Sequence, residues 1–61
     1  MTNVRMEVNE DKTELVIRVR LNERHGMSSS GKTQVVATTA GFVSVPGVEG
    51  IIVGLNVNER K

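Results

Sequence analysis

The alternation of apolar and polar residues constrains the fold of this chain more than any other feature of its sequence. Apolar residues occupy every second position over residues 4–8 and again over residues 15–21. A period of two is typical of a strand with one buried face, whereas a helix repeats about every 3.6 residues, a period that we find nowhere in the chain. The composition agrees, because eleven Val, three Ile and five Thr among 61 residues favour a pleated backbone.

The two alternating segments predict an antiparallel hairpin around a polar turn at residues 9–13. Facing residues must lie on the same face of a sheet, so the two apolar sets must pair with each other. This requirement leaves a tight loop at residues 10–13. It sets the following pairs opposite each other: Val8 and Leu15, Met6 and Ile17, Val4 and Val19.

The second half predicts another hairpin, which differs from the first in having two apolar faces. Its strands are expected within residues 34–45 and 51–57, on either side of a Pro-Gly turn at residues 46–50. The pairing of Val45 with Ile51 sets Val43 opposite Val53 and Phe42 opposite Gly54, and it places Gly41 near Leu55. A sheet with two apolar faces must be covered on both sides.

Small size makes self-association the expected source of additional stability. A chain of this length buries only about 60% of its unfolded surface. It has no cysteine for disulfides or thiolate metal sites, and its one histidine cannot build a histidine-rich metal site. We therefore predict a single all-β domain over residues 1–61, a small antiparallel barrel or sandwich of four or five short strands completed by a homo-oligomer, a dimer or larger. The expected interface residues share one apolar face of the second hairpin: Val36, Phe42 and Ile52.

Two segments are expected to lie outside the strands. Residues 22–32 contain two glycines and three serines and predict a mobile loop, and the polar residues 58–61 are expected to fray. The first ten residues lack the apolar stretch of a signal peptide, and no apolar run approaches the roughly 18 residues of a membrane span. We therefore expect a cytoplasmic protein with no membrane partner.

The letters of residues 26–33, Gly-Met-Ser-Ser-Ser-Gly-Lys-Thr, match the phosphate-loop pattern of nucleotide-binding proteins. In such proteins the loop joins a strand to a helix, whose backbone amides hold the phosphates. Here Thr33 precedes a segment that favours a strand, and no later apolar run ends in an aspartate that would hold magnesium. We interpret the match as coincidental and leave open whether the loop binds any phosphate.

Other arrangements typical of catalysis are incomplete. His25 lies near the serines at 28–30, but a triad also needs an orienting carboxylate and an oxyanion hole on a rigid backbone, and Glu23 is the one carboxylate nearby. A second cluster is expected to be a solvated turn, since it also holds Lys12; its carboxylates are Glu10, Asp11 and Glu14. We expect no enzymatic activity, no cofactor and no metal site.

Basic residues give the leading functional hypothesis, although the formal net charge is only +1. In the first hairpin Arg5 is expected opposite Arg18, an unfavourable pairing of like charges that sometimes marks a functional surface. We predict a non-enzymatic module that binds the phosphate backbone of single-stranded or double-stranded nucleic acid without sequence preference, through Arg5, Arg18, Arg20, Arg24 and Lys32. The alternative is a structural or protein-interaction module whose main activity is homo-oligomeric assembly, and the single Phe, which offers little base stacking, favours this alternative.

Three short motifs carry a resemblance over residues 14–58. They are Leu15-Val-Ile-Arg-Val-Arg-Leu21, then Ser30-Gly-Lys-Thr33 with Val35-Val-Ala-Thr-Thr-Ala-Gly41, and Val53-Gly-Leu-Asn56. With these motifs the chain resembles small uncharacterised β-proteins encoded by phages and bacteria. The resemblance implies no activity, cofactor or site residue.

Overall fold

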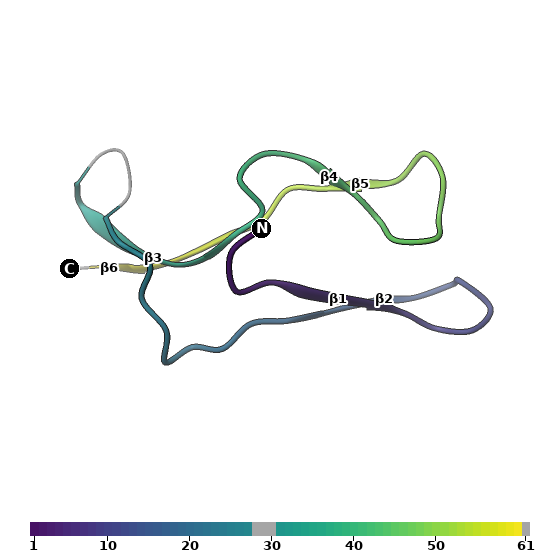
Figure 1. Ribbon diagram of the computed structural model, residues 1–61, viewed down its shortest axis with the longest axis horizontal. Coiled ribbons are helices and arrows are strands. Elements are labelled where there is room, and N and C mark those ends of the chain that lie inside the picture. The colour runs from purple at the N-terminus through teal and green to yellow at the C-terminus, as the bar shows by residue number, and fades with distance from the viewer. Residues whose placement is uncertain (28–30, 61) are drawn as a thin grey trace.

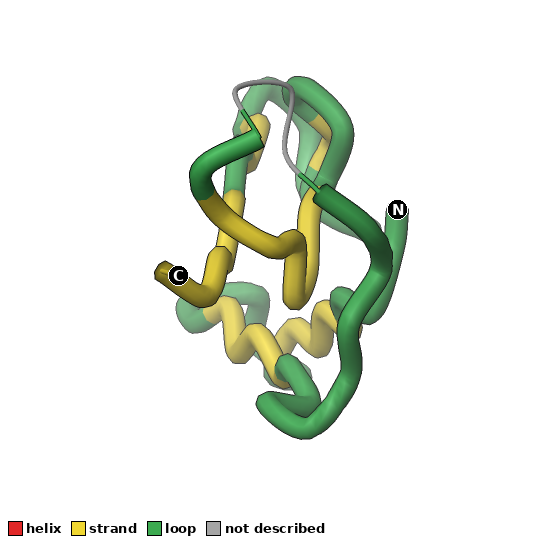
Figure 2. Tube along the Cα trace, turned by 90° about the vertical axis from the view of Figure 1, so that its left-hand side faces the viewer, coloured by secondary structure: helices red, strands yellow, loops and turns green. Residues whose placement is uncertain are grey.

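A computed structural model describes residues 1–27 and 31–60. This part of the chain contains six short strands and no helix (Figures 1 and 2). The all-β prediction is therefore confirmed, with one strand more than expected. The strands are β1 (Arg5–Val8), β2 (Leu15–Arg18), β3 (Thr33–Thr38), β4 (Val43–Ser44), β5 (Ile52–Val53) and β6 (Asn56–Arg60).

The β1–β2 hairpin has the register that its alternation predicts. Met6 lies opposite Ile17 and Val8 opposite Leu15, and the ladder ends at the pair of Arg5 and Arg18, one position short of Val4 and Val19. Asn9 organises the turn, because its side-chain oxygen accepts hydrogen bonds from the backbone N–H groups of Thr13 at 2.8 Å and Glu14 at 2.9 Å. The residues on one face are half-buried and those on the other face are exposed.

The second half forms two consecutive two-stranded sheets instead of one continuous hairpin. The β4–β5 sheet keeps the predicted register, with Val43 opposite Val53 and a 3.0 Å hydrogen bond from the Val45 N–H to the Ile51 carbonyl. Beyond this sheet the register changes, since Thr39 donates its N–H to the Leu55 carbonyl at 3.0 Å. Ala40 (φ 55°) and Gly41 (φ 103°) explain the shift, because a left-handed backbone leaves the extended ladder.

A second irregularity lies in the β3–β6 sheet, where the register shifts between Val35 and Ala37. Such a bulge places one extra residue on one strand and changes the side to which the following residues point. Val36 is 4% exposed and lies in the core beside the buried Ala37, together with Val45. The predicted interface residue Val36 is therefore covered by its own chain.

The three sheets do not close into a barrel within the described residues. Each contains two strands, β1–β2, β3–β6 and β4–β5. Figure 1 shows the hairpins β1–β2 and β4–β5 extending to the same side, away from the β3–β6 sheet. The irregular segment at Ala40 and Gly41 divides what would be one long hairpin, so no sheet gains the strands that closure needs.

The chain is more open than a compact protein of its size. Its radius of gyration is 13.0 Å, whereas a compact 61-residue chain has about 10.5 Å. Its accessible surface is 4662 Å² at a mass of 6.7 kDa, against roughly 3,900 Å² expected for a compact monomer. About 750 Å² of surface therefore remains exposed that compact packing would cover.

Two segments expected to be unpaired take part in the β3–β6 region. Asn58 to Arg60 belong to β6 and lie opposite Thr33 to Val35, so the last strand extends to residue 60. Within the predicted loop 22–32, Met27 forms a bridge with Gln34, and the His25 N–H donates to the Val35 carbonyl at 2.8 Å. Residues 28–30, in the middle of that loop, and residue 61 lie outside the described residues.

Candidate functional site

Three of the five basic residues predicted to bind nucleic acid line one hollow at the β1–β2 hairpin. We call it the arginine hollow; it measures about 490 Å³. The like-charged pair across the ladder places Arg5 and Arg18 there, and Arg20 follows β2. The residues that line it are Asn3, Val4, Arg5, Arg18, Val19, Arg20 and Glu23.

Nearby carboxylates moderate the positive charge of this hollow. The Glu7 carboxylate lies 3.6 Å from Nε of Arg18, but the two side chains are 59% and 65% exposed. An ion pair so open to water gives little energy and holds neither side chain firmly. Glu23 also lines the hollow and contacts Nε2 of His25 at 2.8 Å. The hollow therefore combines three cations with two neighbouring carboxylates.

Asn3 lines the arginine hollow and fixes the backbone there, a role that the sequence pattern did not reveal. Its Nδ2 donates to the carbonyls of Arg20 and Val36, both at 2.8 Å, and its Oδ1 accepts from the Arg20 N–H at 3.2 Å. Asn3 has a left-handed φ of 57°, which asparagine tolerates better than most residues. This side chain ties the arginine-bearing segment to the core strand β3.

Arg24 and Lys32 do not line the arginine hollow. Arg24 forms two hydrogen bonds with the Glu59 carboxylate, at 3.1 Å and 2.6 Å, and donates from Nη1 to the Leu21 and Glu23 carbonyls. The hydrogen bonds and the opposite charge lower the pKa of Glu59 and raise that of Arg24. Arg24 therefore joins the loop before β3 to the last strand, and the exposed Lys32 directly precedes β3.

Two of the three predicted interface residues form an exposed apolar face on the β4–β5 sheet, which we call the outer apolar face. Phe42 is 76% exposed and Ile52 is 59% exposed. A Cβ added to Gly54 would lie 2.9 Å from the Phe42 ring, so the ring covers the glycine as the predicted pairing requires. The third predicted residue, Val36, is buried on the inside of the chain.

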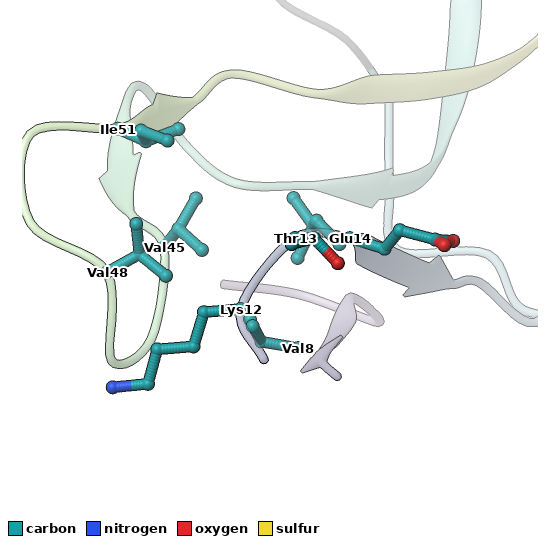
Figure 3. A pocket seen from close by; sticks show the side chains of 8 residues that line it. Val8, Lys12, Thr13, Glu14, Val45, Val48 and Ile51 are labelled. Carbon is teal, nitrogen blue, oxygen red and sulfur yellow. The ribbon is translucent and has the colours of Figure 1, made fainter. Parts of the chain in front are cut away.

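A second hollow, which the sequence pattern does not predict, lies between the tips of the two hairpins (Figure 3). We call it the tip hollow; it measures about 140 Å³ and is mainly apolar. The apolar faces predicted for the two hairpins could have indicated this hollow. Alternation alone, however, does not show which faces pack against each other. The lining residues are Val8, Lys12, Thr13, Glu14, Leu15, Val45, Val48 and Ile51.

The segment that matches the phosphate-loop pattern leads into a strand. Thr33 begins β3 and lies opposite Arg60 of β6, and the Val35 N–H, two residues beyond the segment, donates to the Gly26 carbonyl at 2.7 Å. A phosphate loop would instead continue into a helix at this point. The pattern therefore lacks the backbone context that its chemistry needs.

Other signals for chemistry are sparse in the described part of the chain. No group of three or more potential metal-ligating side chains occurs among the described residues. No helix in the same residues is long and apolar enough to cross a membrane. The three serines considered as partners of His25 lie outside the described residues.

Comparisons with known proteins add no family. No family model matches the chain, and no curated protein or solved structure is significantly similar to it. The geometry of the two hollows and of the outer apolar face therefore carries the functional argument.

Proposed function

We propose that this chain is a structural module whose main activity is assembly with further copies of itself. The observation that carries the proposal is the open shape of the chain, with about 750 Å² of surface beyond that of a compact monomer. A standard protein interface covers about 800 Å² on each partner. One further copy would thus cover as much surface as the open chain leaves uncovered.

The outer apolar face is the surface that we propose for this assembly. Phe42 is the single aromatic residue of the chain and is 76% exposed beside the exposed Ile52. An exposed aromatic next to an aliphatic side chain is typical of the centre of an interface, where burial excludes water. Because both side chains lie outside the core, substitutions there should disrupt assembly without unfolding the chain.

Charged substitutions on this face test the proposal. We expect Phe42→Asp and Ile52→Asp each to reduce the sedimenting mass while the β-sheet circular dichroism spectrum is retained. Val16→Asp is the matched control, since Val16 is an apolar residue 45% exposed on the other hairpin. An unchanged mass for both face variants would remove this face from the proposal.

A second candidate function is sequence-independent binding of nucleic acid, favoured by the convergence of Arg5, Arg18 and Arg20 on one hollow. Arginines without aromatic platforms neutralise phosphates and give little reading of bases. An assembly would present this hollow once per copy, and several weak contacts on one particle strengthen binding. Under this candidate the self-assembled module tracks a phosphate backbone.

A salt titration with single-stranded and double-stranded oligonucleotides tests this second candidate. We expect binding to fall steeply with salt. Arg18→Ala should weaken binding to every sequence alike and reduce, by about one, the slope of the logarithm of the binding constant against the logarithm of the salt concentration. Arg60→Ala, at the exposed end of β6 and away from the arginine hollow, is the control. No binding at low salt would remove nucleic acid and leave the assembly module.

A further inference from the structure

The tip hollow is an incompletely covered apolar site. Its walls come from both hairpins, with Val8 and Leu15 on one side and Val45, Val48 and Ile51 on the other. Val45 is 5% exposed at the bottom, whereas Ile51 is 54% exposed at the edge. An apolar hollow of about 140 Å³ that opens to water gains free energy when another apolar surface closes it.

The two charged side chains that line the tip hollow point in opposite directions. Lys12 and Glu14 both line the hollow, and Figure 3 shows the ammonium and the carboxylate pointing away from each other. The end of the Lys12 side chain lies near Gly47 in the opposite hairpin turn, 3.9 Å from where a Cβ on that glycine would lie. The rim therefore carries a cation at one end and an anion at the other.

We propose that the tip hollow is a self-contact in which two copies dock about a two-fold axis. Such an axis brings the same patch of both copies together, and each pairing then occurs twice. Lys12 of each copy meets Glu14 of the other, while Ile51 and its apolar neighbours close the hollow from both sides. This contact rests on the proposed assembly function and adds a second surface to the outer apolar face.

The occupant is a second copy because the rim is complementary to itself. A two-fold rotation of the rim brings its one lysine to the glutamate of the other copy and its one glutamate to the lysine, so both charges find a partner in a second copy. A chain with two different self-complementary faces forms assemblies larger than a dimer. The tip hollow and the outer apolar face lie on different sides of the β4–β5 sheet: Val45 lines the hollow, and Phe42 with Ile52 marks the opposite face.

Charge reversal tests the contact through the sedimenting mass of full-length variants at low salt. We expect the wild type to be larger than a dimer and Lys12→Glu and Glu14→Lys each to give a smaller assembly, with at least about tenfold weaker association. The double variant K12E/E14K and an equimolar mixture of the two single variants should both recover the wild-type mass. Glu10→Lys is the matched control, because it makes the same charge change as Glu14→Lys in the same turn but outside the hollow.

Each result distinguishes this contact from the assembly function itself. If the wild type is assembled and both single variants have the same mass as the wild type, the tip contact is overturned and the assembly function stands. A monomeric wild type overturns both. A double variant that keeps the β-sheet circular dichroism spectrum but not the wild-type mass overturns the pairing of Lys12 with Glu14.

Discussion

The two halves of the chain use strands of similar composition in different ways. The β1–β2 hairpin has one half-buried apolar face and one exposed face that carries Arg5, Glu7, Val16 and Arg18. The second half has apolar residues on both faces and contains all the buried apolar residues of the described chain, Val36, Ala37 and Val45. The first half therefore stands as a simple amphipathic hairpin, whereas the second half supplies the core and leaves Phe42 and Ile52 uncovered.

The difference shows when alternation determines register. In the β1–β2 hairpin a slip by one residue would turn the arginines inward, so one register is favoured strongly and is the one observed. In the second half a slip exchanges one apolar face for another and costs little. A bulge at Val36 and a left-handed backbone at residues 40–41 are tolerated there, and the second of these divides the hairpin into two sheets.

The largest expected effect is a charge in the core of the second half. Val36→Asp would bury an unpaired carboxylate, and we expect a loss of at least roughly 3–5 kcal/mol, about the whole stability of a domain of this size. Val16→Asp, on the exposed face of the first hairpin, should cost less than about 1 kcal/mol. Thermal unfolding followed by circular dichroism measures both. Similar losses for the two variants would contradict the assignment of the core to the second half.

A smaller effect is expected where the two halves are joined. Asn3→Ala removes three side-chain hydrogen bonds and places alanine at a left-handed φ, so we expect a loss of about 2 kcal/mol in denaturant unfolding. Asn3→Gly separates the causes, because glycine accepts the φ but cannot restore the bonds. Asn9→Ala, which loosens the turn of one hairpin alone, should cost about 1 kcal/mol. If Asn9→Ala costs more than Asn3→Ala, the link between the halves is weaker than its geometry implies.

The smallest effect concerns the pair Arg24 and Glu59, which holds the loop before β3 to β6. The pKa of Glu59 is lower in the folded chain, so the pair stabilises the fold above the ordinary glutamate pKa near 4.3, and this contribution is lost as the pH falls through the lowered pKa. Unfolding followed from pH 6 to pH 2 should show this loss in the wild type. Glu59→Gln should show a shallower dependence, and identical acid profiles for the two proteins would refute the contribution.

The sequence predicted local pairing well and the arrangement of the hairpins less well. The registers of β1–β2 and β4–β5 and the cover of Gly54 by Phe42 follow from alternation and from the Pro-Gly turn. The burial of Val36 depends on a bulge, and the place of Arg24 depends on a partner 35 residues away in Glu59. Neither signal is local, and a two-residue period does not indicate that the tips of the two hairpins meet around the tip hollow.

The mass of the wild-type protein in solution tests the central claim most directly. Sedimentation equilibrium over micromolar concentrations should give a multiple of the 6.7 kDa chain mass, because an open chain with an exposed aromatic face gains about 800 Å² of cover from a partner. The mass should fall below the wild-type value in Phe42→Asp, whose fold remains β-sheet. A wild type that sediments as a stable 6.7 kDa monomer throughout this range would contradict the account.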